Sequence, residues 1–163
     1  MRFIGARTSL PQIPVVVDNF MLEGKTWLVM SRLPGHCLAD VYPEITPEIE
    51  QRLSSQLSHI LAPLRAIPPP GPARAHSRPH EIRLTHNDLS AHNILVDDDW
   101  NITGIVDWEA CAWMPEYWEL TKGTFLLQYR KGRWNRIMTS VFPGYASELE
   151  AERYIVKYRR RYT

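Results

Sequence analysis

The sequence predicts an α+β fold, with a small strand-bearing part near the N-terminus and a larger, mainly helical part after it. Three observations support this division. Two apolar runs near the N-terminus flank a Glu-Gly-Lys turn, and a long segment after Thr46 carries apolar residues at helical spacing. Two further apolar runs, after Asn93, flank an acidic turn. We therefore expect a strand pair, a core helix and a second hairpin, in that order.

The N-terminal part predicts the end of a helix followed by two paired strands. Residues 1–8 contain apolar residues that fit a helix end. The apolar runs at residues 15–17 and 27–30 are separated by Glu23-Gly24-Lys25, so an antiparallel pair is expected. The local sequence of residues 31–35 predicts the end of a strand followed by a Pro-Gly turn.

The segment after Thr46 predicts the main core helix. Thr46 offers an N-cap hydroxyl, and Pro47 suits the first helical position. Pro63 is expected to kink or end this helix, and residues 68–79, rich in Pro, Gly, Ala, Arg and Ser, predict an exposed connector. The apolar residues that recur on one face of the helix are Ile49, Leu53, Leu57, Ile60, Leu61 and Leu64.

Helices are also expected towards the C-terminus. One is predicted from about Pro115 to Tyr129, and two more near residues 133–141 and 146–161. Four aromatic residues of these last helices are expected to pack on the helical part rather than bind a ligand, and they are Trp134, Phe142, Tyr154 and Tyr158.

The residues that predict chemistry lie between Leu84 and Glu109. His86-Asn87-Asp88 is followed, five residues after Asp88, by Asn93, and the hairpin around the acidic turn then leads to Asp107. A carboxylate beside a hydroxyl nucleophile orients it and accepts its proton, which suits Asp88. Hard divalent cations take oxygen ligands, and the Asn93 amide and the Asp107 carboxylate supply two. The hairpin brings these distant residues to one site.

In detail this stretch resembles the aminoglycoside phosphotransferase family of kinase-like small-molecule phosphotransferases. His86-Asn87-Asp88 and Asn93 match the family's His-x-Asp-x-x-x-x-Asn loop, and residues 105–109 (Ile-Val-Asp-Trp-Glu) match its Ile-x-Asp-Trp-Glu segment. Residues 115–119 (Pro-Glu-Tyr-Trp-Glu) resemble forms found in fungi. The resemblance runs from about Met1 to the mid-130s. His92 departs from the family, which commonly has a small residue before the asparagine.

The resemblance implies a protein-kinase-like fold. Residues 1–33 would be a remnant of the N-terminal β lobe with the interlobe linker. Residues 34–163 would form the helical C-terminal lobe, with the catalytic loop and the metal-binding hairpin. The implied function is transfer of the ATP γ-phosphoryl group to a hydroxyl of a small-molecule acceptor, with Mg²⁺ as cofactor.

The resemblance also implies a role for each motif residue. Asp88 would be the catalytic base, Asn93 and Asp107 the metal ligands, and His86 a structural brace of the loop. Glu119 would be tied to the backbone of the catalytic loop, although a carboxylate on a helix surface is an open alternative. Adenine would be bound by the linker residues Met30, Ser31 and Leu33, the last two through backbone groups.

Some parts of a kinase-like enzyme are missing from the sequence. No G-x-G-x-x-G precedes Ile13, no lysine precedes Lys25 and no glutamate precedes Glu23. The chain therefore resembles a family member that is truncated within its smaller lobe. A non-catalytic pseudoenzyme or binding module is the main alternative, because the clamp for the ATP phosphates is absent.

A clustering of histidines raises a further alternative, a transition-metal hydrolase. Four histidines lie near Asp88 in the sequence, namely His76, His80, His86 and His92. No H-E-x-x-H or C-x-x-C frame accompanies them, so the kinase-like interpretation is favoured.

Composition and charge indicate a cytoplasmic globular protein. The 163 residues are enough for one compact domain, and the net charge of +1 gives no bulk electrostatic reason to bind nucleic acid or a membrane. Cys37 and Cys111 form no disulfide-rich pattern. No stretch approaches the roughly 20 apolar residues of a membrane span.

Overall fold

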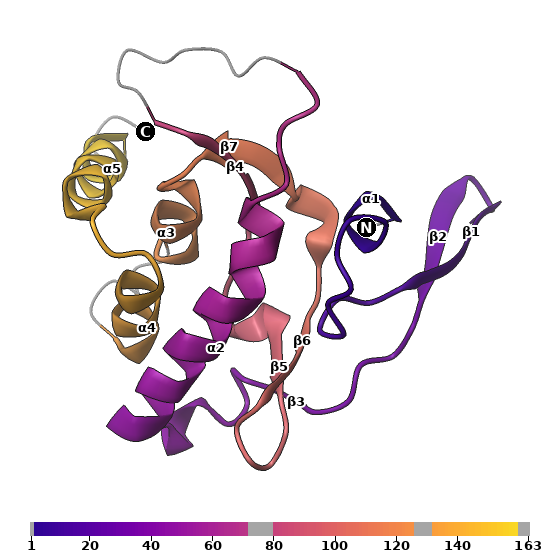
Figure 1. The fold of residues 1–163 in the computed structure, drawn as a ribbon, viewed down its shortest axis with the longest axis horizontal. Coiled ribbons are helices and arrows are strands. Elements are labelled where there is room, and N and C mark those ends of the chain that lie inside the picture. Colours follow the sequence, from indigo (N-terminus) through magenta and orange to yellow (C-terminus); the bar gives the residue numbers. More distant parts are fainter. Residues whose placement is uncertain (1, 72–79, 126–131, 160–163) are drawn as a thin grey trace.

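The computed structural model describes residues 2–71, 80–125 and 132–159 and confirms an α+β architecture. The short helix α1 (Arg2–Gly5) and the hairpin of β1 (Val16–Leu22) and β2 (Lys25–Met30) lie on one side of the molecule. The helices α2 to α5 lie on the other side, and the hairpin extends away from them (Figure 1).

The first hairpin forms where two apolar runs flank a tight turn, as predicted. Strand β1 pairs antiparallel with β2, and the turn residues Glu23 and Gly24 have φ angles of 52° and 73°. Two consecutive left-handed residues give a turn whose twist matches that of paired strands. Both strands extend beyond the apolar runs that predicted them, and their side chains are mostly exposed.

The linker after β2 is fixed against a second sheet. Strands β3 (His36–Cys37), β5 (Ile94–Val96) and β6 (Ile102–Ile105) form an antiparallel sheet in the order β3-β5-β6. Gly35 has a φ of 108°, and a Cβ there would lie 2.6 Å from both Thr103 Oγ1 and the Val96 carbonyl oxygen. Because no side chain fits, glycine lets the linker lie directly on the β5–β6 hairpin.

The core lies between α2 (Pro47–Arg65) and α4 (Arg133–Val141). The Thr46 hydroxyl caps α2 by accepting a hydrogen bond from the Ile49 N–H at 3.4 Å. Pro63 lies inside the helix, which continues for two residues to Arg65. The predicted apolar face is confirmed, and the side chains buried to 0% exposure on these two helices are Leu53, Leu57, Trp134, Ile137 and Met138.

The predicted helix from Pro115 to Tyr129 is wrong in its first part. Pro115 ends strand β7 (Ala112–Pro115), which pairs antiparallel with β4 (Ile82–Thr85). Helix α3 (Trp118–Gly123) begins only after this strand. The strand forms because β4 offers it a hydrogen-bonding partner, a long-range effect that local spacing does not reveal. The prediction is also wrong at its C-terminal end, because α3 ends at Gly123 and Thr124 and Phe125 are not helical. Residues 126–129 of the predicted helix lie outside the described residues.

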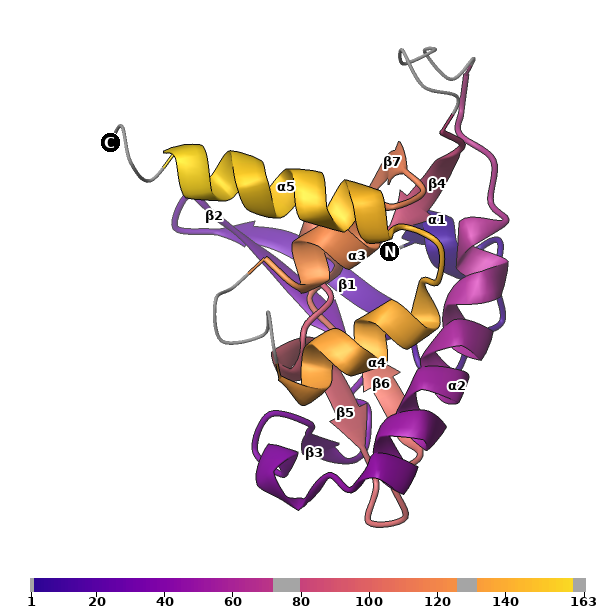
Figure 2. The ribbon, with the colours of Figure 1, turned by 90° about the vertical axis from the view of Figure 1, so that its left-hand side faces the viewer.

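The two last predicted helices are present. Helix α5 (Ala146–Arg159) follows α4, and in Figure 2 α5, α3 and α4 lie one above another beside α2. Trp134 and Phe142 are buried as predicted. Tyr154 is 66% exposed, so its predicted packing is wrong. The Tyr158 side chain lies outside the described part of the chain.

No helix within the described ranges has both the length and the apolar character needed to cross a membrane.

Candidate active site

The loop after β4 is anchored by its apolar residues. Leu89 is fully buried, and Ala91 is 1% exposed in the 3-10 turn η2 (Ala91–Asn93). The Ala91 carbonyl oxygen accepts a hydrogen bond from the Ala39 N–H at 3.1 Å, and this bond joins the loop to the segment after β3. Asp88 and His92 are exposed. The loop therefore presents the carboxylate of Asp88 on a fixed backbone, and His92 points outward.

Glu119 ties this loop to α3. Its carboxylate accepts the His86 N–H at 2.6 Å and the Asn87 N–H at 3.0 Å, and its side chain is 1% exposed. The prediction of a structural tie is therefore confirmed. Burial raises the pKa of Glu119 to about 7, and the two backbone hydrogen bonds oppose that rise.

His86 braces the loop from inside. Its Nε2 lies 2.8 Å from the Val106 carbonyl oxygen, and its Nδ1 accepts the Asp88 N–H at 3.3 Å. The Val106 carbonyl oxygen can only accept a hydrogen bond, and the Asp88 N–H can only donate one. The ring therefore carries its proton on Nε2, leaves Nδ1 unprotonated and is neutral. Burial lowers the pKa of His86, which favours the same neutral form. The ring also packs edge-on against Trp108 at 4.5 Å.

Asn93 connects the loop to the segment that carries Asp107. Its Nδ2 donates to the Asp88 carbonyl oxygen at 2.8 Å and to Asp88 Oδ2 at 3.2 Å. Its backbone carbonyl oxygen accepts the Val106 N–H at 2.9 Å. Since the Asn93 amide nitrogen is occupied by Asp88, its amide oxygen is left as the group that can bind a cation.

Asp107 occupies an unusual backbone conformation. Its φ and ψ are 61° and 57°, in the left-handed region, and its side chain is exposed at the start of the 3-10 turn η3 (Trp108–Ala110). A non-glycine residue there costs free energy, and such residues cluster at functional sites. Val106, the residue before Asp107, is bonded through its N–H to Asn93, which is itself bonded to Asp88.

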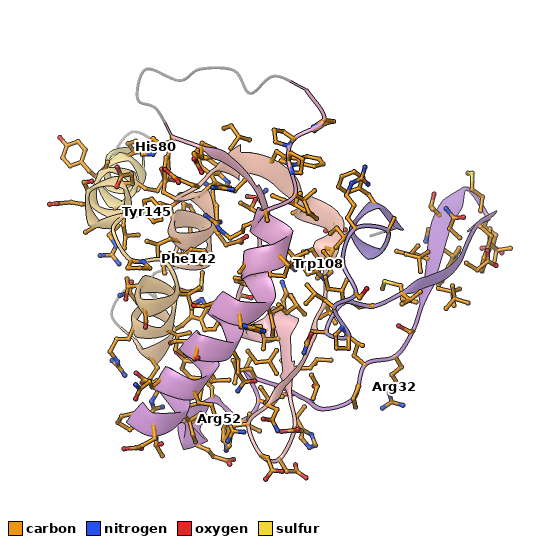
Figure 3. The ribbon with its side chains drawn as sticks, in the orientation of Figure 1. Arg32, Arg52, His80, Trp108, Phe142 and Tyr145 are labelled. Carbon is orange, nitrogen blue, oxygen red and sulfur yellow. The ribbon has the colours of Figure 1, made fainter. Side chains whose placement is uncertain are left out.

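A cavity of about 830 Å³ lies between the N-terminal elements and the segment after β6. Asp107 lies on its wall, together with the neighbouring Glu109. Trp108, also on this wall, lies between α2 and α1 in the view of Figure 3. The other lining residues are mostly apolar, and they are Phe3, Ile4, Val16, Asn19, Leu28, Met30, Pro70, Leu84, Cys111 and Trp113. Mostly apolar walls with a few polar groups are typical of a small-molecule site.

The linker residues predicted to bind adenine have different surroundings. Met30 lines the cavity, whereas Ser31 and Leu33 are not among the described residues that line it. The Ser31 N–H donates to the Val15 carbonyl oxygen at 2.8 Å, and the Leu33 side chain lies against Gly104. Arg32, between them, points away from the protein (Figure 3).

The histidines that the structure describes do not form a metal-binding frame. No group of three or more His, Cys, Asp or Glu side chains in the described ranges is arranged to hold a metal ion. His80 lies beside α5 (Figure 3), where its ring nitrogens are 3.3 Å from Glu116 and 3.7 Å from Glu148. His76 lies outside the described residues.

Sequence reasoning missed several residues of this region. Glu109, Cys111 and Trp113 line the cavity beside Asp107, and burial raises the pKa of the Cys111 thiol to about 11. Trp118 donates a hydrogen bond to the Asn87 side chain from helix α3. The proximity of Glu109 to Asp107 in the sequence was an available signal, whereas nothing in the sequence connects residue 118 with residue 87.

Comparison with known proteins gives a family match and a structural match. The family described as the phosphotransferase enzyme family (APH) matches residues 73–155, which is half of the chain. A comparison with curated proteins finds no match. The structure of the ternary complex of APH(2″)-IIa with streptomycin and ATP is similar, with a TM-score of 0.64 and 14% sequence identity.

The alignment with that structure covers 93% of this chain and 66% of the other, so this chain spans less than two thirds of its length. At this level of identity the likeness concerns the fold. It confirms the predicted kinase-like α+β fold.

Proposed function

Because this chain belongs to the phosphotransferase enzyme family, we propose that it transfers the γ-phosphoryl group of ATP to a hydroxyl group of a small molecule. The acceptor oxygen forms a bond to the γ-phosphorus, and the bond from that phosphorus to the β–γ bridging oxygen breaks. ADP leaves, and the proton of the acceptor hydroxyl goes to a base of the protein.

One observation carries this proposal. The Asn93 side chain donates hydrogen bonds to Asp88. The Asn93 backbone carbonyl oxygen accepts a hydrogen bond from the N–H of Val106, the residue before Asp107. These bonds join Asp88 to Asn93 and hold the residue before Asp107 next to Asn93, and Asp107 lines the large cavity; this arrangement supports the proposed roles. Phosphoryl transfer depends mainly on positioning and electrostatic stabilisation, which such a network provides.

In this proposal Asp88 is the base. Its carboxylate is exposed and within 3.2 Å of Asn93 Nδ2, so it has one fixed partner and remains open to an acceptor hydroxyl. A general base must lie within hydrogen-bond reach of the proton that it accepts. The Nδ1 of His86 accepts a hydrogen bond from the Asp88 N–H. In this role His86 keeps the loop in place and does not itself exchange a proton.

The residues present fit Mg²⁺. The Asn93 amide oxygen and the Asp107 carboxylate are hard oxygen donors, which this ion prefers, and it keeps several waters where the protein supplies few ligands. When bound, Mg²⁺ would neutralise charge on the β- and γ-phosphates. Adenine would lie near Met30, with the Ser31 carbonyl oxygen and the Leu33 N–H as its backbone partners.

A binding protein without catalysis is the second candidate. None of the described residues that line the cavity is a lysine or an arginine, and two of them, Asp107 and Glu109, are acidic. Without a cationic side chain, the charge of a triphosphate has to be balanced by bound metal ions alone. We therefore expect a dissociation constant for MgATP no tighter than about 0.1–1 mM.

Two substitutions at the site separate catalysis from binding. Asp88→Asn should lower turnover by about 100-fold or more, because the base is lost, while the affinity for MgATP changes little. Asp107→Asn should weaken Mg²⁺-dependent nucleotide binding by at least about tenfold, because a charged ligand is lost. Phosphate transfer to a panel of small alcohols and calorimetry with MgATP measure the two effects.

Asp98→Asn is the matched control for both. It is the same chemical change in the turn between β5 and β6, where the Asp98 side chain is 95% exposed. Turnover of Asp88→Asn within a few-fold of the wild-type value would rule out the proposed transfer. MgATP binding without transfer to any alcohol would instead favour the binding protein.

A further inference from the structure

The side chain of Asn87 joins the two loops of the proposed site. Asn87 stands between His86 and Asp88 and has a φ of 68°, in the left-handed region. Asparagine is among the few non-glycine residues that adopt this conformation readily. The left-handed conformation of Asn87 sets the direction of the chain at the next residue, Asp88.

Both ends of the Asn87 amide are occupied by partners from other segments. Its Oδ1 accepts the indole N–H of Trp118 at 2.7 Å, and its Nδ2 donates to the Ala110 carbonyl oxygen at 3.2 Å. An indole N–H can only donate and a carbonyl can only accept, so the orientation of the amide is fixed by its partners. An aspartate or a leucine of similar size would lose one or both bonds.

The two partners come from functionally distinct segments. Ala110 ends η3, the turn that begins directly after Asp107, and Trp118 begins α3 one residue before Glu119. Glu119 in turn accepts the Asn87 N–H. Asn87 is therefore bonded at three points to the metal-ligand segment and to α3.

We infer that Asn87 and Trp118 are positioning residues that set the place of Asp88 relative to Asp107. This inference rests on the proposed phosphoryl transfer, in which a base and a metal ligand act together. Neither side chain takes part in the chemistry. A displacement of about 1 Å at a reacting group costs on the order of 100-fold in rate, so removal of these bonds acts on turnover more than on nucleotide affinity.

Two single variants and their combination test the inference. Asn87→Gly keeps the left-handed backbone accessible and removes both amide bonds, while Trp118→Phe keeps a ring and removes the indole N–H. Each should lower kcat about tenfold or more with the KM for ATP within about threefold. The double variant should be no worse than Asn87→Gly, because both changes remove the same bond.

Hydrogen exchange provides a readout that needs no activity. The amide protons of residues 86–88 and 110 should exchange about three- to tenfold faster in Asn87→Gly and in Trp118→Phe than in the wild type. Trp134→Phe is the matched control. It also removes an indole hydrogen bond, from Trp134 Nε1 to the Gly123 carbonyl oxygen at 2.8 Å, and it should leave the exchange of these four amides unchanged relative to global unfolding.

The outcomes distinguish this inference from the proposed function. If the wild-type chain transfers no phosphate, the proposed function fails, and hydrogen exchange alone decides whether Asn87 and Trp118 hold the loops. Additive effects of the two substitutions, or wild-type exchange of the loop amides in both single variants, would overturn the positioning role.

Discussion

Glu119 shows how one residue meets two opposing physical requirements. Its carboxylate is buried, which disfavours charge, yet it accepts two backbone N–H groups, which favours charge. Burial raises its pKa to about 7, above the ordinary value of 4.5. The loop that carries Asp88 therefore depends on a carboxylate that titrates near neutral pH.

The first prediction concerns the pH dependence of stability. A raised pKa means that folded Glu119 takes up a proton more readily than unfolded Glu119, so its contribution to stability is fully present below about pH 4.5. That contribution is lost as the pH rises through about 7, and the loss is about 3 kcal/mol. Urea unfolding from about pH 5 to about pH 8 measures it.

Glu119→Gln supplies the comparison, because glutamine has no charge at any of these pH values. The difference in unfolding free energy between the wild type and this variant should decrease towards higher pH. The local effect has the opposite sign, since ionised Glu119 accepts both N–H groups, so the amides of His86 and Asn87 should be best protected above pH 7. A pH-independent difference in stability would contradict the proposed titration of Glu119.

At the scale of an element, α2 supports the site from a distance. Its N-cap, its proline at the first position and its apolar face each follow local rules, and its buried face packs on α4 and contacts β4 and β6. Because β4 leads into the loop that carries Asp88 and β6 leads to Asp107, α2 supports both parts of the candidate site.

The second prediction tests this core. Leu57→Ala should lower the unfolding free energy by about 2–5 kcal/mol, because Leu57 is fully buried and its removal leaves a cavity. Ser55→Ala, on the exposed side of the same helix, should change it by less than about 0.5 kcal/mol. Thermal and urea unfolding measure both, and equal effects of the two substitutions would contradict the observed packing.

The third prediction concerns the β1–β2 hairpin, which has little apolar cover. Phe20, Met21, Trp27 and Leu28 are 44%, 72%, 51% and 48% exposed. A hairpin of two strands is marginally stable in water. Its amide protons should therefore exchange faster than those of β5 and β6, whose residues are mostly buried. Hydrogen exchange along the whole chain checks this, and equal protection of the two hairpins would show that β1 and β2 are held more firmly than their exposure indicates.

At the scale of the whole molecule, the large cavity joins the elements of both parts. Its walls come from α1, β1, β2, β4 and the segment from Asp107 to Trp113. A ligand that fills this cavity contacts the N-terminal elements and the helical part together. Binding there should therefore stabilise the folded state as a whole.

The fourth prediction is that MgATP raises the unfolding temperature. At about 10 mM, which is about 10–100 times the expected dissociation constant, the stabilisation should be about 1.4–2.7 kcal/mol. For a chain of this size that corresponds to a rise of about 3–10 °C. Asp107→Asn should lose most of this rise, and Asp98→Asn should keep it. A shift of the same size in Asp107→Asn would place the nucleotide away from Asp107.

The sequence by itself determined the elements that depend on short-range rules. Capping at Thr46, the apolar spacing of α2, the Glu23-Gly24 turn and the hairpin that leads to Asp107 all follow from neighbouring residues. The His86 to Asn93 motif identified the family for the same reason, since its spacing is local. The fold class followed from these elements together with the resemblance.

Only the tertiary structure decided the contacts between distant segments. Strand β7 exists because Ala112 to Pro115 pair with β4, and the predicted helix therefore begins at Trp118 rather than at Pro115. Tyr154 is exposed because the packing of α5 on α3, and not its composition, decides which of its faces is buried. The bond between Trp118 and Asn87 spans 31 residues. Such contacts arise from chain segments that meet only in the folded state, so no local pattern in the sequence predicts them.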